Sequence, residues 1–154
     1  MKPEFINPFL NATINVISTM AMIQPKAGKP YLKKDKKASG DISGVIGLTG
    51  AMKGAIVISF SAGAVCKIVG SMLGEEYNEL NDDISDAVGE LTNMISGDAR
   101  RKLAELGHNF EAGIPTIIRG KEHVIESITK GPVIAIPFKV DDDEFVVEAS
   151  FDKV

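Results

Sequence analysis

The chain has 154 residues, of which 44% are apolar and 25% are charged, and its formal net charge is −4. This length and composition predict one compact domain over residues 1–154, and the negative charge argues against a general affinity for nucleic acid or an anionic membrane. No segment approaches the roughly 20 apolar residues that span a bilayer, and a single cysteine, Cys66, excludes an internal disulfide. We therefore expect a cytoplasmic protein that binds neither nucleic acid nor membrane.

The first half of the chain predicts two helices separated by strands and turns. Apolar residues at spacings of three or four indicate a helix over residues 3–22, which Pro25, Gly28 and Pro30 bring to an end. Residues 33–37, Lys-Lys-Asp-Lys-Lys, are interpreted as a charged, solvent-exposed turn whose contact with a partner is left open. Glycines at 44, 47 and 50 are weak evidence for a phosphate-binding loop, because no helix follows them directly. A turn at 52–54, a strand at 55–60 and a helix over 61–73 that stops near Gly74 follow.

The second half begins with the longest predicted helix. It starts at Asp82 or Asp83, continues to about Leu106 and stops at Gly107. Strand patterns follow at 111–119, 124–128, 133–140 and 144–151, with an exposed hairpin turn at the three aspartates 141–143. Because proline cannot donate to a neighbouring strand, Pro132 and Pro137 indicate a sheet edge or a bulge at 133–140. The pattern predicts an α+β fold with long helices packed against a mostly antiparallel sheet.

A faint internal duplication relates the two halves of the chain. Glu4-Phe5-Ile6-Asn7 is followed after 22 residues by Pro30, and Glu90-Leu91-Thr92-Asn93 is followed after 21 residues by Pro115. Residues 53–60 also resemble residues 130–138. This duplication predicts that each half contributes a long helix and a few strands to one sheet with pseudo-twofold symmetry.

One face of the predicted long helix carries polar residues that indicate a functional site. At about 100° per residue, an apolar stripe suited to packing on a sheet is formed by Ile84, Val88, Leu91, Ile95 and Ala99. The opposite side holds Asp86, Glu90, Asn93 and Gly97. Glu90 and Asn93 are three residues apart and are therefore surface neighbours. Gly89 and Gly97 weaken the helix but remove bulk near this pair, which would let another protein come close. The alternative interpretation is an ordinary solvent-exposed helix face.

The arrangement Asp86-x3-Glu90-x2-Asn93, with Pro115 after 21 further residues, resembles the phosphatase signature of the CheC/CheX/FliY family of chemotaxis proteins. The resemblance is to the CheX branch and covers nearly the whole chain. Its fragments are residues 6–9, 28–30, 46–50, 58–61, 72–74 and 89–94. It implies a CheC-like fold and a protein phosphatase that acts on the aspartyl phosphate of a CheY-like response regulator.

The resemblance also implies a role for each residue of the helix face. Glu90 would anchor to a lysine of the regulator, and Asn93 would orient the water that attacks phosphorus. Asp86, Gly97 and Pro115 would support the site or leave room for the partner. A carboxylate forms a charge-assisted bond to a lysine, and a neutral amide both donates to and accepts from a water without repelling a phosphoryl group. The magnesium ion would belong to the regulator, this chain would bind no metal or cofactor, and two subunits would join their sheets in a homodimer.

Other interpretations of the sequence remain open beside this one. Glu4 and Asn7 have the spacing of the second site found in CheC-type members, but Pro8 places them at the start of a helix. His108 and His123 have no metal-ligand spacing and are interpreted as surface histidines. A different function for the same helix face is the docking of a response regulator or a flagellar-switch component without hydrolysis.

Overall fold

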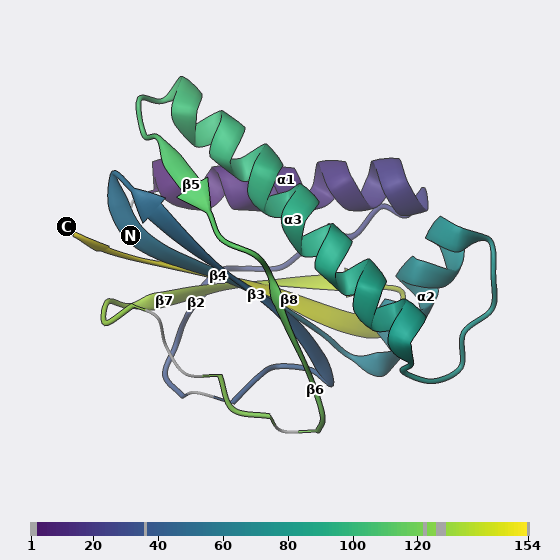
Figure 1. Cartoon of the computed structure of the whole chain (residues 1–154). Helices are drawn as coiled ribbons and strands as arrows, with labels where there is room; N and C mark the ends of the chain where they lie inside the picture. Colours follow the sequence, from purple (N-terminus) through teal and green to yellow (C-terminus); the bar gives the residue numbers. More distant parts are fainter. Residues whose placement is uncertain (1–2, 36, 122, 126–128, 154) are drawn as a thin grey trace.

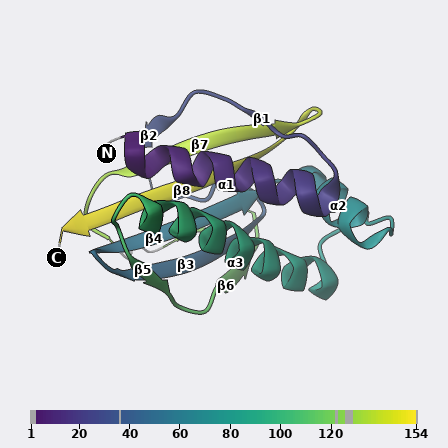
Figure 2. The same cartoon turned by 90° about the horizontal axis from the view of Figure 1, so that it is seen from above.

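In the computed structural model, which describes residues 3–35, 37–121, 123–125 and 129–153, helices cover one face of an antiparallel sheet (Figure 1). The helices are α1 (Pro3–Ala21), α2 (Ala62–Leu73) and α3 (Asp82–Glu105). The eight strands are β1 (Lys26–Ala27), β2 (Tyr31–Lys33), β3 (Ile42–Gly50), β4 (Met52–Phe60), β5 (Phe110–Ala112), β6 (Thr116–Arg119), β7 (Val133–Val140) and β8 (Asp143–Lys153). Seen from above, α1 and α3 lie side by side across the sheet, and α2 lies at one end (Figure 2). The predicted α+β class is confirmed.

The strand order relates the two halves of the chain by a pseudo-twofold axis. The order is β1-β7-β8-β4-β3-β5, and β2 also pairs with β7 while β6 pairs with β3. Each half therefore supplies a long helix, two short outer strands and a long hairpin, and the axis passes between β4 and β8. Pro30 precedes β2 as Pro115 precedes β6, in agreement with the predicted duplication. The match of 53–60 to 130–138 is wrong, because β4 corresponds to β8 and not to β7.

Capping residues fix the ends of the two helices that border the 74–81 segment. Ser61 caps α2 by accepting a hydrogen bond from the backbone N–H of Ala64 at 3.1 Å, and Gly74 ends it at φ 68°. The side chain of Asn81 accepts from Ile84 N at 2.9 Å, so that α3 begins at Asp82. The predicted positions of both helices are confirmed.

The apolar stripe of α3 is fully buried against the sheet, as the sequence predicts. Its members are Ile84, Val88, Leu91, Ile95 and Ala99, each with 0% exposure. They meet the inner positions of the central strands, which include Ile46, Ile56, Ile58, Phe60 and Val147. Burial of these side chains holds α3 in place, and the other side of the helix is left for the polar residues.

Several predicted boundaries are wrong where a tertiary contact decides the local structure. Residues 52–54 belong to β4 and form no turn, and the strand expected at 111–119 is divided into β5 and β6. Of the strand expected at 124–128, Val124 forms an isolated bridge with Lys37, and 126–128 lie outside the described residues. Pro132 precedes β7, and Pro137 faces the interruption between β1 and β2, where its carbonyl accepts from Gly28 N at 2.8 Å. β7 therefore lies next to the sheet edge that β1 and β2 form, as expected for a strand near an edge, and its pairing with β8 contains no bulge.

Charged residues expected to be solvated form ion pairs. Lys33, expected in an exposed turn, ends β2, and its Nζ lies 2.8 Å from Glu148 Oε2, with both side chains largely buried. Burial raises the pKa of Glu148, and Lys33 offsets part of that rise. At the hairpin expected to be solvated, Lys67 Nζ lies 2.7 Å from Asp143 Oδ2 and 3.6 Å from Asp141 Oδ2. The expectation of a solvated side chain is wrong for Lys33, whereas Asp141 and Asp142 are exposed at the hairpin as expected.

Both histidines are half-buried, which corrects their interpretation as surface residues. The ring of His108 packs against Phe5 in a tilted arrangement, with 4.7 Å between centroids and 38° between the ring planes. His123 Nδ1 lies 2.7 Å from the carbonyl oxygen of Gly120, and its Nε2 lies 2.7 Å from Ser43 Oγ. Because a carbonyl oxygen only accepts, Nδ1 carries the proton and Nε2 accepts from the serine. His123 therefore fastens its segment to the face of the sheet opposite the helices.

Candidate functional site

The polar face of α3 presents Asp86, Glu90 and Asn93 to solvent, and Gly97 is half-buried on the same face. The structure therefore brings together four of the five predicted site residues on the side of α3 opposite its buried residues. Within the described part of the chain, the side chains of Glu90 and Asn93 form no hydrogen bond or ion pair with another residue. Both are available to a group outside this chain.

A buried contact on the opposite side of α3 fixes the height of this helix above the sheet. Thr92 is fully buried, and its hydroxyl donates to the carbonyl of Val88 at 2.7 Å. Gly44 of β3 lies directly beneath it: a Cβ on Gly44 would overlap Thr92 Oγ1 and lie 3.1 Å from Thr92 Cβ. The glycine that gave weak evidence for a phosphate loop is instead a close-packing position. It allows α3 to lie close to the sheet at the residue that precedes Asn93.

The fifth predicted residue, Pro115, lies in the link between β5 and β6. It is half-buried and precedes β6, which runs beside α3. Gly89 faces this strand, since a Cβ there would lie 3.7 Å from Ile117 Cδ1. Gly89 is thus turned toward β6, where a Cβ would make only an ordinary van der Waals contact. At Gly97, a Cβ would meet only Arg100 Nη2 within 4 Å, at 3.9 Å, so the space beside this residue is open.

On its other flank, α3 borders a groove that it shares with α1. The groove encloses about 450 Å³, and Gly97 and Met94 of α3 line it opposite Asn15, Val16 and Thr19 of α1. Sequence analysis did not single out Asn15 or Thr19. No local pattern marks them, because their place beside Gly97 depends on the pairing of two helices that are far apart in the chain.

The corresponding residues of the first half lie at the beginning of α1. Glu4 and Asn7 are exposed, and Glu4 is in the first turn. Pro8 lies inside the helix and has no N–H to donate to the carbonyl of Glu4. This geometry agrees with a segment that starts a helix, in contrast to Glu90 and Asn93, which lie well inside α3.

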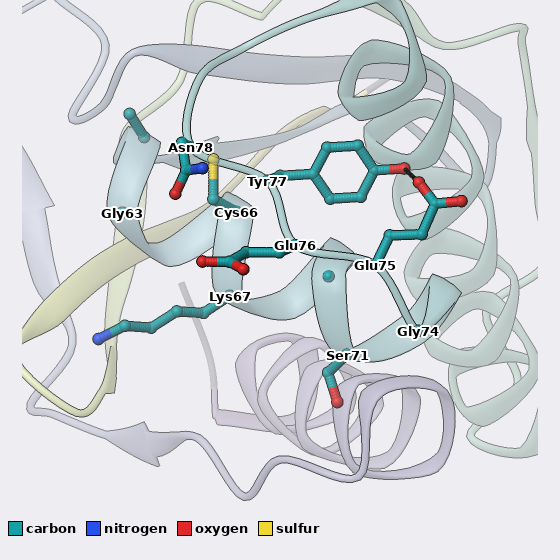
Figure 3. A pocket seen from close by; sticks show the side chains of 11 residues that line it. Gly63, Cys66, Lys67, Ser71, Gly74, Glu75, Glu76, Tyr77 and Asn78 are labelled. Carbon is teal, nitrogen blue, oxygen red and sulfur yellow. Dashed lines mark hydrogen bonds between the residues drawn. The ribbon is translucent and has the colours of Figure 1, made fainter.

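A larger cavity than the groove between α1 and α3 lies in a different region (Figure 3). It encloses about 660 Å³ between α2 and residues 74–78, and none of the predicted site residues lines it. The hydroxyl of Tyr77 lies 3.0 Å from Glu75 Oε2 and 3.4 Å from Asp83 Oδ2, and desolvation together with these carboxylates raises its pKa to about 12. Burial raises the pKa of the Cys66 thiol, which disfavours the nucleophilic thiolate.

The part of the chain that the structure describes contains neither a cluster of metal ligands nor a membrane-spanning helix. No group of three or more His, Cys, Asp or Glu side chains is placed to hold a metal ion there. No helix of the described residues is long and apolar enough to cross a membrane.

The whole fold superposes on a CheC-like superfamily protein from Shewanella sp. PV-4 with a TM-score of 0.92 at 40% identity, covering 99% of each chain. The family model described as chemotaxis phosphatase CheX matches residues 42–139. The CheY-P phosphatase CheX of Thermotoga maritima is 32% identical over 145 residues, which cover 94% of this chain and 92% of that protein. The chain therefore belongs to the CheX family of chemotaxis phosphatases.

Solved structures agree with this assignment. A chemotaxis protein CheX from Desulfovibrio desulfuricans superposes with a TM-score of 0.90 at 48% identity, covering 97% of this chain and 99% of that one. CheX in the CheX-CheY-BeF3-Mg+2 complex from Borrelia burgdorferi superposes with a TM-score of 0.83 at 25% identity, covering 97% of this chain and 98% of that one.

Proposed function

We propose that this protein removes the phosphoryl group from the aspartyl phosphate of a CheY-like response regulator. The observation that carries the proposal is the pair Glu90 and Asn93, exposed on α3 and without hydrogen bonds to the described residues. Membership of the CheX family supports it, as does the complex of the Borrelia burgdorferi relative with CheY.

In this proposal, the helix face completes the active site of the partner. The Glu90 carboxylate forms a charge-assisted bond with a lysine of the regulator and thereby holds the helix in register. The Asn93 amide orients a water in line with the phosphorus–oxygen bond. The water oxygen bonds to phosphorus, the bond to the aspartate oxygen breaks, and inorganic phosphate leaves as H2PO4⁻, which carries the oxygen and both protons of the water. The aspartate is returned as a carboxylate.

Positioning of one water is sufficient for a useful acceleration. Phosphoryl transfer depends mainly on placing the reactants and stabilising charge, and the magnesium ion on the regulator provides much of that stabilisation. A hundredfold acceleration requires a barrier lower by only about 2.7 kcal/mol. Asp86 and Pro115 support the placement of the helix face against the regulator, and Gly97 leaves room for it.

The test is the decay of a phosphorylated, magnesium-loaded CheY homologue, with the protein present in substoichiometric amount. We expect the wild-type protein to accelerate decay with turnover, and Asn93→Ala to lower kcat by about a hundredfold with little effect on KM. Asn7→Ala is the matched control: it removes the corresponding amide from α1 and should leave kcat unchanged. Equal rates for wild type and Asn93→Ala would contradict the role of Asn93.

A docking module without hydrolysis is the alternative for the same surface. It predicts binding of the regulator with no change in the lifetime of its phosphoryl group, so that the decay experiment distinguishes the two functions. A homodimer is also part of the proposal. Sedimentation equilibrium of the pure protein measures its mass in solution, and a monomer at micromolar concentration would count against it.

A further inference from the structure

β6 runs beside α3 in the opposite direction. Near the start of the helix, Asp82 Oδ1 lies 3.7 Å from Arg119 Nη2 at the end of the strand. Two turns further along α3, a Cβ on Gly89 would lie 3.7 Å from Ile117 Cδ1. Residues earlier in β6 therefore lie beside residues later in α3, in the direction of the helix turn that carries the Glu90–Asn93 pair.

Ile114 comes next in this direction, and it is 90% exposed. Its neighbours restrain the link in which it lies: Gly113 donates its N–H to the carbonyl of Gly47 at 3.0 Å, and Pro115 fixes the backbone on the other side. Because the backbone of this link is already held, a partner that covers Ile114 has little main chain to order. Ile114 thus presents apolar surface to solvent at the flank of α3 that faces β6.

The other flank of the pair borders the groove between α1 and α3. Val16, which is 7% exposed, and Met94 provide apolar lining, and Asn15 and Thr19 provide polar groups. A methyl group on Gly97 would project beside this groove and meet only the end of the flexible Arg100 side chain. The protein's own side chains therefore leave this space open.

We infer that the receiver domain of the regulator is held on both sides of the Glu90–Asn93 pair. An apolar part of its surface covers Ile114, and one of its side chains enters the groove beside Gly97. The inference rests on the proposed function, and it commits to this occupant because both features are continuous with the helix face that would enter the regulator's active site. Two flanking contacts restrict rocking of the helix, which would otherwise move the water that Asn93 orients.

Two substitutions test the two flanks through binding. The probe is a CheY homologue loaded with magnesium and beryllofluoride, whose dissociation constant is measured by calorimetry. We expect Ile114→Ser to raise Kd by about tenfold, as the loss of a buried apolar contact does at interfaces. Gly97→Ala is expected to raise Kd as well, although it raises the melting temperature, because alanine favours the helix and meets no close neighbour. These opposite changes separate a lost contact from a damaged fold.

Leu32→Ser is the matched control, since Leu32 is 55% exposed in β2 at the opposite edge of the sheet. Its Kd for the regulator should equal that of the wild type.

Unchanged Kd values for both Ile114→Ser and Gly97→Ala would overturn the inference while leaving the phosphatase function intact. Conversely, wild-type protein that binds without accelerating decay would refute the function, and weaker binding of the two variants would still support the docking surface. With phosphorylated regulator as substrate, both variants should raise KM and keep the wild-type kcat, whereas Asn93→Ala lowers kcat. Absence of binding by the wild type would overturn both proposals.

Discussion

Replacing Gly44 by alanine should disturb the site from the opposite side of α3. The new Cβ would overlap Thr92 Oγ1 and lie 3.1 Å from Thr92 Cβ and 3.3 Å from Thr92 Cγ2. Thr92 cannot turn away freely, because its side chain is β-branched, fully buried and bonded to the carbonyl of Val88. The alanine methyl must therefore push α3 away from β3 or force Thr92 into a poorer rotamer.

The expected cost follows from this geometry. Overpacking of a filled site costs about 1–3 kcal/mol, and the rigidity of Thr92 places Gly44→Ala near the upper part of that range. Alanine in a strand recovers about 0.5–1 kcal/mol relative to glycine, which leaves a net loss of about 2 kcal/mol. Thr92→Ala alone should cost about 1 kcal/mol through the loss of a buried hydrogen bond. In the double variant, Oγ1 and Cγ2 are absent and their overlap with the new methyl is gone. The double variant should therefore lose about 1–2 kcal/mol less stability than the two single variants lose together.

Urea denaturation of the wild type, both single variants and the double variant measures this coupling. Gly89→Ala serves as a control in α3, because its Cβ would make only an ordinary contact with Ile117 at 3.7 Å, and it should not lower stability. If the stability losses of the two single variants add up to that of the double variant to within about 0.5 kcal/mol, the close-packing argument is refuted. Because Thr92 precedes Asn93, the phosphatase assay should also show a lower kcat for folded Gly44→Ala protein, and the double variant should recover part of it.

Two further predictions concern charged groups away from the site. Lys33→Met should lower the free energy of unfolding by about 3 kcal/mol, because it leaves Glu148 buried without its cation. In the same urea experiment, the double variant with Glu148→Leu should recover most of this loss. A Lys33→Met protein as stable as the wild type would contradict a buried pair. Tyr77 holds its proton more tightly in the folded protein, where its pKa is about 12. The stability that this protonated side chain contributes is therefore complete below its ordinary pKa of about 10 and is lost as the pH rises from about 10 to 12. Melting temperatures of the wild type and Tyr77→Phe should accordingly converge over that range, and parallel curves would show that Glu75 and Asp83 do not perturb the phenol.

The parts of the fold that the sequence predicted are those set by neighbours along the chain. The bounds of α2 and α3, the buried stripe of α3 and the bounds of β7 follow from local start and stop signals and from periodicity. The exposed positions of Glu90 and Asn93 follow from the same periodicity, because a helix with one buried stripe leaves its opposite face to solvent. Their proposed roles rest on resemblance to a family and on no spacing rule.

The parts that the sequence did not predict depend on contacts between distant residues. Lys33 pairs with a carboxylate 115 residues away, and His123 bonds to a serine 80 residues away. A charged run or a lone histidine carries no sign of such a partner, so each was interpreted as solvated. The division of 111–119 into two strands has the same origin, because β5 and β6 pair with different parts of β3.

Thr92 packs against the sheet and the adjacent Asn93 faces solvent, and this pairing connects the fold to the proposed chemistry. Adjacent residues of a helix point about 100° apart, so one can be buried while the next is exposed. Thr92 is buried and bonded inside the protein, whereas Asn93 is exposed and its side chain forms no hydrogen bond with the described residues. Substitution of Asn93 should therefore change the reaction with little change in stability, and substitution of Gly44 or Thr92 should change both. In the proposed reaction, the placement of α3, and with it of the water that Asn93 would orient, therefore depends on Gly44 and Thr92, which lie on the side of the helix away from the regulator.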